Sequence, residues 1–351
     1  MKLSFPASAR LALVAAALAT LSQISQALPT YSVRVVTMEG YTQLAEGLNS
    51  HGTVAVQVTT QGGANYRCSK AECTPIPSLP NDRQQLYAYP TAIDDQGTVV
   101  GNSYVGSVEH AMLWDGAAIH DLGTFGEDEC GGCKSFSQAW AINGKGAVVG
   151  YSDTANHDYQ AFVWRDGTMT KLPTLGGTRS SAHGINDAGD VVGFSSLANG
   201  TSHAFLYRDG QIRDLGLLRS GDTSTAYAIN NLGQVVGDGN TGQTKPRRVA
   251  FLYDSQGGLR ELPLLKGWHE MTAHDINDAG WVVGSAIAAG HQSGYVFDGQ
   301  ATFDLNFAIS EKDRKQWRIY HATDINAKGQ ILVEAQNKKD GTTRVLVLTP
   351  H

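Results

Sequence analysis

A single pattern recurs seven times along the chain, and this repetition limits the possible folds more than any other sequence feature. The pattern reads small-x-x-Ile-Asn-x-x-Gly-x-Val-Val-Gly, and residues 139–150 form a complete copy. A second half follows, best seen in residues 203–216, where Asp-Gly comes after a His-Ala-Phe-Leu segment. The turn glycine of the first half recurs every 43 to 49 residues, at Gly52, Gly97, Gly146, Gly189, Gly233, Gly280 and Gly329.

Each unit contains four short segments with strand alternation. Asn-x-x-Gly and Asp-Gly turns join them, because both supply the positive φ of a tight hairpin. Four strands at a period of about 40 to 50 residues are typical of a β-propeller blade, whereas β-solenoid coils are shorter. The sequence therefore predicts an all-β, seven-bladed β-propeller of four-stranded antiparallel blades. We expect the repeats at about 41–87, 88–136, 137–179, 180–223, 224–270, 271–318 and 319–351.

The two ends of the chain complement each other. The last repeat stops at residues 344–348, which match a third strand, and no fourth strand follows. Residues 31–36 have the character of the missing strand. We therefore expect the N-terminal segment, residues 28–40, to pair with the last blade and close the ring, which removes the exposed edges of an open array.

The first 27 residues resemble a cleavable signal peptide. Lys2 and Arg10 precede an apolar run at 11–21, and Ser25-Gln26-Ala27 forms a small-x-small cleavage site. Residues 28–351 then form one propeller domain. They contain no run of about 18 apolar residues, so we expect no membrane span and a secreted or periplasmic location.

Charge and motifs exclude several classes of ligand. The chain has 27 basic and 33 acidic residues, a formal net charge of −6, which disfavours nucleic acid. His269 and His274 are one residue too far apart for a zinc-protease motif, and turn chemistry explains the Asn-x-x-Gly loops better than calcium binding does. We expect no metal, no cofactor and a monomer.

Several segments resemble a known family. The segment His203-Ala204-Phe205, its relative at 110–112 and the shortened forms at 161–162 and 250–251 resemble the HAF-family extracellular repeats of bacteria. The likeness covers nearly all of residues 28–351, including the end of the chain. The resemblance implies a secreted bacterial repeat protein, and it implies no established reaction, ligand or catalytic residue.

Four cysteines in an exported chain favour two disulfides. Alignment of the repeats places Cys68 directly opposite Cys73 across a turn, so we predict that they are bonded. Cys130 and Cys133 form a CxxC motif, which we interpret as a structural disulfide. A redox pair and a zinc site are the alternatives for this motif.

One repeat position carries most of the chemical diversity. It lies two residues before the repeat Ile or Leu and holds Glu46, Thr91, Trp140, His183, Tyr227, His274 and Thr323. As a ligand-facing surface, Trp140 and Tyr227 would stack on a sugar or another planar ligand, while His183, His274 and Glu46 supply polar contacts. Strand alternation favours the other interpretation, in which these side chains wedge between adjacent blades.

The main hypothesis is a secreted, non-catalytic module that binds an extracellular carbohydrate, peptide or protein. Loops carry binding residues, and the connections 78–89, 124–138 and 309–320 are long; we expect the last to be a solvated charged loop. The alternative is an extracellular polysaccharide hydrolase or lyase. Its histidine should lie within hydrogen-bond reach of an acid in the central pocket, and the candidates are His274, His321, Asp275, Asp324 and Glu270.

Overall fold

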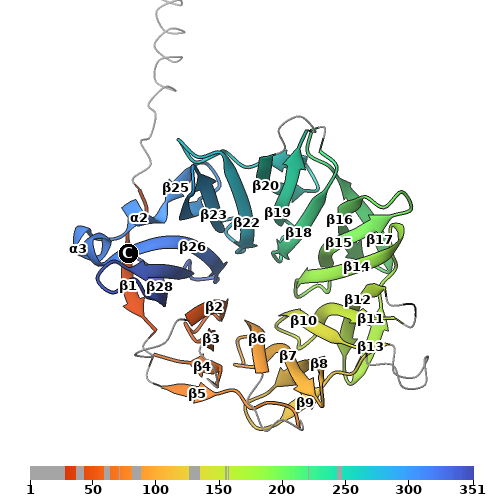
Figure 1. The fold of residues 1–351 in the computed structure, drawn as a ribbon. Helices are drawn as coiled ribbons and strands as arrows, with labels where there is room; N and C mark the ends of the chain where they lie inside the picture. The colour runs from red at the N-terminus through yellow and green to blue at the C-terminus, as the bar shows by residue number, and fades with distance from the viewer. Residues whose placement is uncertain are drawn as a thin grey trace, which may run out of the picture.

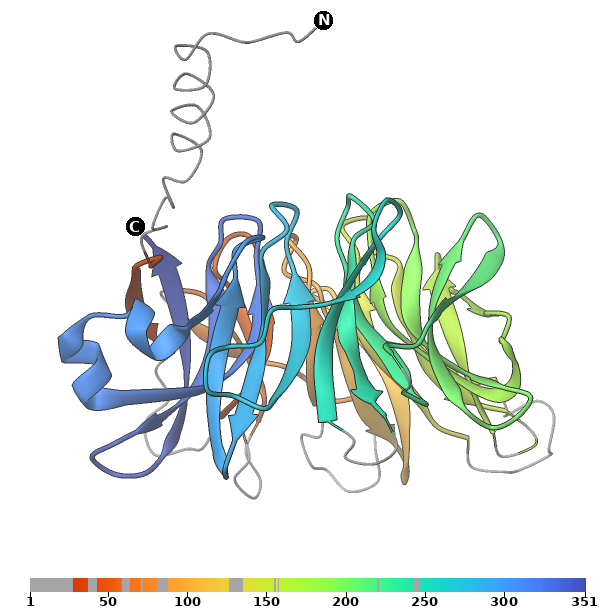
Figure 2. The same ribbon diagram turned by 90° about the horizontal axis from the view of Figure 1, so that it is seen from above.

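The computed structural model describes residues 28–36, 43–58, 64–70, 72–80, 88–125, 135–154, 156, 158–219, 221–242 and 247–351. Within them the predicted seven-bladed β-propeller is confirmed, because seven four-stranded sheets surround a central axis (Figure 1). Seen from the side, the blades form a disc whose strands run roughly along this axis (Figure 2). The predicted signal peptide lies outside the described residues.

The first strand of each repeat is innermost, which the sequence left undecided (Figure 1). Blade 1 contains β2 (Gln43–Leu48), β3 (Val54–Val58), β4 (Tyr66–Cys68) and β5 (Cys73–Pro75). Blade 2 contains β6 (Ala88–Ile93), β7 (Val99–Val105), β8 (Val108–Trp114) and β9 (Ile119–Asp121). Blade 3 contains β10 (Ser137–Ile142), β11 (Val148–Asp153), β12 (Tyr159–Arg165) and β13 (Thr168–Lys171).

The remaining blades follow the same order. Blade 4 contains β14 (Gly176–Ile185), β15 (Val191–Leu197), β16 (Ser202–Arg208) and β17 (Gln211–Gly216). Blade 5 contains β18 (Ser224–Ile229), β19 (Val235–Thr241), β20 (Arg247–Asp254) and β21 (Gly258–Glu261). Blade 6 contains β22 (Glu270–Ile276), β23 (Val282–Ala288), β24 (His291–Phe297) and β25 (Thr302–Asp304). Blade 7 contains β26 (Trp317–Ile325), β27 (Ile331–Asn337), β28 (Thr343–Pro350) and β1 (Tyr31–Val35).

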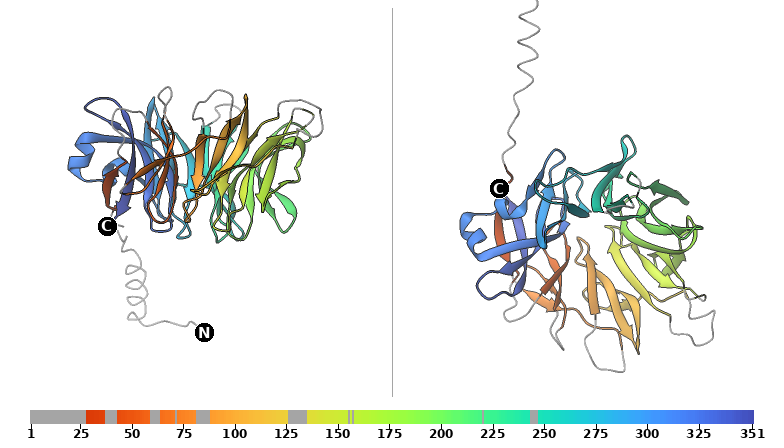
Figure 3. Two further views of the ribbon diagram at one scale, coloured as in Figure 1. Left: turned by 90° about the horizontal axis from the view of Figure 1, so that it is seen from below. Right: turned by 45° about the horizontal axis from the view of Figure 1, so that its top comes forward.

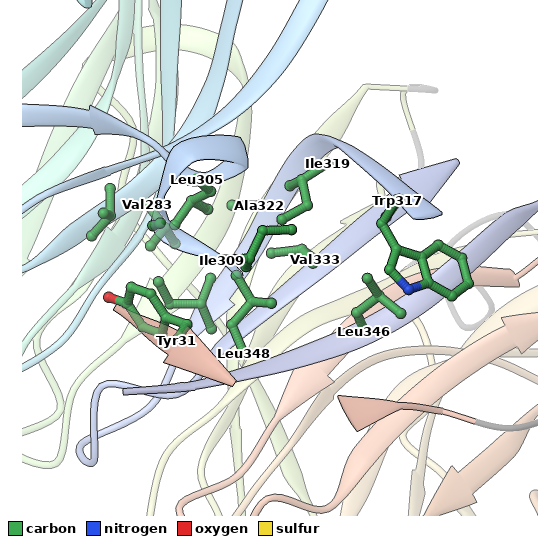
Figure 4. Close-up of a cluster of buried hydrophobic side chains, with 14 of the residues drawn as sticks. Tyr31, Val283, Leu305, Ile309, Trp317, Ile319, Ala322, Val333, Leu346 and Leu348 are labelled. Atoms are coloured by element: carbon green, nitrogen blue, oxygen red, sulfur yellow. The ribbon is translucent and has the colours of Figure 1, made fainter. Parts of the chain in front are cut away.

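The last blade joins the two ends of the chain, as predicted. β1 pairs antiparallel with β28, from Tyr31 opposite Pro350 to Val35 opposite Leu346, and the tilted view in Figure 3 shows β1 in place beside this blade. The Tyr31 side chain is 2% exposed and packs in a cluster with residues of blade 7 and the segment before it (Figure 4). Residues 37–40 of the predicted closing segment lie outside the described residues.

Local chemistry explains the repeat. Gly146 in the first-hairpin turn has φ 77°, and Asp209-Gly210 in a second-hairpin turn has φ 51° and 78°, as the turn residues predict. The glycine within the Val-Val-Gly strand is required by close packing rather than by a turn. A Cβ at Gly193 would lie 1.9 Å from the carbonyl oxygen of Ser181, so the innermost hairpin has no room for a larger residue there.

The connection 309–320 is charged and largely exposed over residues 310–316, as expected, but part of it is a helix rather than a loop. This connection contains α3 (Glu311–Gln316), which follows the short helix α2 (Leu305–Ala308). The Ser310 side chain caps α3 by accepting from the Asp313 backbone N–H, and basic residues occupy the last turn. No helix in the described part of the chain is both long enough and apolar enough to cross a membrane.

Candidate functional site

Every innermost strand carries a β-bulge at the same place. In blade 3 the register passes from Ala139 to Ala141 and leaves Trp140 without a partner residue on β11. A bulge turns the strand locally and redirects one side chain. The bulged residues in this position are the chemically diverse set of the sequence, Glu46, Thr91, Trp140, His183, Tyr227, His274 and Thr323. Because these strands are innermost, the seven bulges surround the central channel.

Some of the bulged side chains also join adjacent blades. His183 Nδ1 donates to the Ala226 carbonyl at 3.1 Å, since a carbonyl oxygen can only accept. His274 Nδ1 donates to the Ala322 carbonyl at 2.8 Å in the same way. Both rings remain half-buried at the channel. The two interpretations of this position are therefore compatible, because one side chain both bridges two blades and contributes to the channel wall.

Aromatic rings form an arc on this wall across blades 3 to 6. Trp140 is 39% exposed, and its ring meets His183 edge to face at 5.9 Å. His183 and Tyr227 stack at 5.6 Å with an interplanar angle of 9°. Tyr227 then meets His274 at 6.5 Å. We call Trp140, His183, Tyr227 and His274 the aromatic arc.

Both histidines of the arc are neutral at pH 7. Burial lowers the pKa of His183 to about 4. Burial, together with the nearby His321, lowers the pKa of His274 to about 4. The His274 Nε2 atom is also engaged, because Thr272 Oγ1 lies 2.8 Å from it. These imidazoles therefore act as neutral hydrogen-bonding groups on the channel wall.

Asp238 adds a polar group beside the arc that the sequence analysis missed. It is 6% exposed, and burial raises its pKa to about 6 while Arg248 opposes this shift. The Tyr227 side chain is hydrogen-bonded to the Asp238 carboxyl. Among the described residues, Asp238 Oδ2 has no hydrogen-bond partner, and Arg248 Nη1 is 3.7 Å away. Asp238 directly follows the repeat glycine Gly237, and this position differs between repeats. That variation was the sequence signal that could have identified it.

A cluster of ionisable groups occupies the channel wall at blades 6, 7 and 1. His321 Nδ1 lies 3.5 Å from Glu334 Oε2, and the rings of His274 and His321 are 4.5 Å apart. Glu334 also accepts from the Ala45 backbone N–H at 3.1 Å. Burial and the neighbouring Glu334 raise the pKa of Glu46 to about 8. Two carboxyl groups here thus share a restricted space beside an imidazole.

Two further carboxyl groups bond the backbone of the next blade. Asp275 Oδ2 accepts from the Ile325 N–H at 2.8 Å, and Asp324 Oδ2 accepts from the Leu48 N–H at 2.7 Å. Burial and the nearby Asp275 raise the pKa of Asp324 well above its ordinary value. Glu270 lies apart from this pair, because it begins β22 opposite Ile287 while Asp275 is near the end of that strand. The structure therefore places His274 beside His321 and Asp275 beside Asp324, and Glu270 lies apart from both pairs.

The asparagine of the repeat closes a ring of hydrogen bonds around one mouth of the channel. In six blades its Nδ2 donates to the carbonyl oxygen of the equivalent residue in the next blade, at 2.9 to 3.2 Å. Its Oδ1 accepts from the turn, as in the bond from the Ala147 N–H. Asp94 is the exception, since a carboxylate cannot donate to Asn143. The donors are Asn49, Asn143, Asn186, Asn230, Asn277 and Asn326.

This mouth is a polar cavity of about 290 Å³, to which all seven blades contribute their Ile-Asn or equivalent turns. Carboxylates at its rim already accept hydrogen bonds from the backbone of a neighbouring blade. Asp187 Oδ1 accepts from the Gly144 N–H and Asp95 Oδ1 from the Ser50 N–H, each in the preceding blade. The sequence analysis assigned the Asn-x-x-Gly segment to turn chemistry alone and missed its role between blades.

The repeat histidine of the His-Ala-Phe segment joins two strands of one blade. His203 Nδ1 lies 2.8 Å from Asp214 on the outermost strand, and His110 Nδ1 lies 2.9 Å from Asp121 in blade 2. Where Lys171 replaces the aspartate, the histidine is replaced as well, by Gln160. The pair is structural and explains why the histidine varies between repeats.

The predicted disulfide between Cys68 and Cys73 is confirmed; the bond joins the two outer strands of blade 1. Cys130 and Cys133 lie outside the described residues, so their pairing stays a prediction. Among the described residues, no three His, Cys, Asp or Glu side chains are grouped so that they could hold a metal ion.

Comparison with known proteins supports the fold. Residues 173–265, which include blades 4 and 5, match the model of a protein family of unknown function (DUF3466). A search of curated proteins found no match.

Solved structures with similar folds are distant in sequence. The acylaminoacyl peptidase of Pyrococcus horikoshii has a TM-score of 0.51 at 12% identity, over 87% of this chain and 52% of that one. The β-propeller domain of the Trilobed protease from Pyrococcus furiosus has a TM-score of 0.50 at 10% identity, over 88% and 97%. A gluconolactonase from Xanthomonas campestris has a TM-score of 0.45 at 11% identity, over 94% of each chain. At these identities the first two similarities show the propeller fold alone.

Proposed function

We propose that this protein is a secreted, non-catalytic binding module that holds an extracellular carbohydrate, peptide or protein at its central channel. The aromatic arc is the observation that carries the proposal. Trp140 presents an exposed ring, and the stacked rings of His183 and Tyr227 continue the same wall. Aromatic faces on rigid strands bind the apolar side of a ligand, and the adjacent Asp238 carboxyl is an acceptor for its polar groups.

The bonding of the ionisable groups supports binding without catalysis. The ring nitrogens of His274 are engaged by Ala322 and Thr272, and the ring is neutral at pH 7. Asp275 and Asp324 each accept from a backbone N–H of the next blade. Groups that hold neighbouring blades together are not available to transfer protons during turnover, so we assign them to the stability of the ring.

A hydrolase or lyase remains the second candidate because of Glu46 and Glu334. A carboxyl group that stays protonated at pH 7 can serve as a general acid beside a second carboxyl group. With its pKa raised to about 8, the Glu46 carboxyl is protonated at pH 7 and could donate a proton. The imidazole of His321 lies beside Glu334. Glu46→Gln would abolish such a reaction.

One experiment separates the two functions. The purified protein is passed over immobilised polysaccharides and peptides, and each mixture is also analysed for released products. We expect retention without products, and retention should be lost in Trp140→Ala and Tyr227→Ala. Leu232→Ala, which removes a 71% exposed side chain outside the arc, should behave as the wild type. Product formation that Glu46→Gln eliminates would establish the enzyme instead.

The proposal includes export and a monomeric state. Support for export comes from the sequence of residues 1–27, and the resemblance to HAF-family extracellular repeats agrees with it. Mass spectrometry of the mature protein should give an N-terminus at Leu28. Light scattering of the same sample should give the mass of one chain. An uncleaved protein in the cytoplasm would contradict the export.

A further inference from the structure

A row of aromatic side chains leads into the arc from blades 3 and 4. Its members are Phe136, Tyr151, Tyr159 and Phe194, which we call the aromatic stripe. Consecutive ring centroids are 5.8, 5.3 and 6.4 Å apart, and Phe194 is 5.7 Å from His183 of the arc. All four side chains are half-buried. The stripe and the arc are therefore one continuous aromatic surface.

The stripe lies toward the channel end opposite the asparagine ring. Tyr159 pairs with Asp153, the last residue of β11, whereas the Asn143 turn precedes the first residue of that strand. Phe136 is fixed at the same end, because its carbonyl accepts from the Asp153 N–H at 2.9 Å. The surface thus runs from the far ends of the blade 3 strands across to the bulge of blade 4.

Polar side chains border the stripe and are held in place. The Tyr151 hydroxyl donates to Gln138 Oε1 at 2.9 Å, and Gln138 Nε2 donates to Glu109 Oε2 at 2.9 Å. Arg179 lies 5.8 Å over the Tyr159 ring and pairs with Asp158. Aromatic faces alternate here with hydrogen-bonding groups that are already oriented.

Two buried polar atoms along the surface lack hydrogen-bond partners among the described residues. Ser181 is opposite Phe194 in the register, so the two side chains project from the same face of blade 4. The Ser181 hydroxyl is buried with no hydrogen-bond partner among the described residues. Asp238 Oδ2, beside Tyr227 of the arc, also has no hydrogen-bond partner among the described residues, although it forms an ion pair with Arg248 Nη1 at 3.7 Å. Unsatisfied buried groups are rare, and a polar ligand is one explanation for them.

We propose that the stripe and the arc together form the binding platform for a neutral polysaccharide chain, an inference that rests on the proposed binding function. Sugar rings present apolar faces that stack on aromatic rings and hydroxyl edges that bond to the flanking polar groups. A nucleic acid would need a basic path, whereas acidic Glu109 and Asp158 border the stripe and Arg179 is paired with Asp158. The stripe also crosses blades, whereas a peptide that adds a strand follows one sheet edge.

The test measures retardation of the native protein in gels that contain a neutral β-glucan, a galactomannan or a xylan. We expect retardation by at least one of them, and about tenfold weaker binding in Tyr159→Ala, which removes a stripe ring. Trp140→Ala should weaken binding similarly. Phe307→Ala is the matched control, because this ring is 60% exposed on α2 and far from the stripe in the fold. Tyr151→Phe, which removes only a hydroxyl, guards against loss of folding and should weaken binding less than Tyr159→Ala.

The outcomes separate the two proposals. If Trp140→Ala weakens binding and a folded Tyr159→Ala does not, the stripe is refuted and the binding module stands. If the protein binds only peptides, proteins or nucleic acid, the polysaccharide assignment is overturned. If no polysaccharide, peptide or protein binds, both proposals fail.

Discussion

The gap in the asparagine ring makes Asp94→Asn a sensitive test of how the blades are joined. Six repeats donate a side-chain N–H to the next blade, and the seventh cannot, because Asp94 has no N–H to offer Asn143. The Asp94 Oδ1 atom already accepts from the Thr98 N–H at 2.7 Å, and an amide would keep this bond. The substitution therefore adds one donor and leaves the turn in place.

The magnitude follows from the bond gained. Asn49 and Asp94 are 5% and 8% exposed, so the ring is shielded from water. A buried neutral hydrogen bond contributes about 0.5 to 1.5 kcal/mol net. We expect Asp94→Asn to raise the free energy of unfolding by about 1 kcal/mol. The reverse change, Asn277→Asp, removes the donor to Asn326 and should cost about 1 to 3 kcal/mol.

Urea unfolding at pH 7, followed by far-ultraviolet circular dichroism, measures both variants. Asp95→Asn is the matched control, since it removes a charge at the same mouth without adding a donor to the ring; the Asp95 acceptor for the Ser50 N–H is retained. If Asp94→Asn is no more stable than Asp95→Asn, the asparagine hydrogen bonds do not stabilise the contact between blades, and the reasoning is refuted. The reasoning is also refuted if Asn277→Asp leaves the free energy of unfolding unchanged.

Three other perturbations test separate parts of the structure. The folded protein binds a proton at Glu46 between about pH 4.5 and 8 that the unfolded chain releases, so stability should fall as the pH rises through this window. Glu46→Gln has no group to titrate and should not show this fall. Urea unfolding at pH 5 and pH 8 should therefore show the free energy of unfolding of the wild type falling relative to that of Glu46→Gln, by up to about 1.4 kcal/mol per pH unit. A double-mutant cycle of His203→Ala and Asp214→Ala should give a coupling of about 0.5 to 1 kcal/mol, and zero coupling would contradict the strand-joining role. Deletion of residues 28–36 removes β1, and calorimetry should show a large loss of stability, because burial of Tyr31 alone contributes roughly 1.5 to 3 kcal/mol. A truncated protein that melts at the wild-type temperature would refute closure by β1.

The sequence predicted which residues form the aromatic arc but not how their side chains are oriented. The position of Trp140, His183 and Tyr227 was found from its variation between repeats, because equivalent residues of a repeat protein occupy equivalent places. Their orientation was not, since simple strand alternation takes no account of a bulge. The bulge leaves these residues out of the register and sets them at the channel.

The hydrogen bonds between blades also escaped the sequence analysis. A local turn explains Asn143 fully, so nothing in its own segment reveals the second bond from Nδ2 to Asn186. The pairing of His203 with Asp214 was hidden for the same reason, although both residues are replaced in blade 3, by Gln160 and Lys171. The repeat thus revealed which positions matter, but it did not reveal their partners, which lie on another strand or in another blade.

The sequence by itself determined the number of blades, their four strands, the closure by the N-terminal strand and the disulfide between Cys68 and Cys73. These features depend on hairpin turns, strand alternation and a fixed repeat, which are local and therefore visible in a linear sequence. Only the tertiary structure decided that the first strand is innermost and that Phe136 and Phe194 belong to one aromatic surface. The curvature of the closed ring brings such residues together, and no short segment of the chain encodes that curvature.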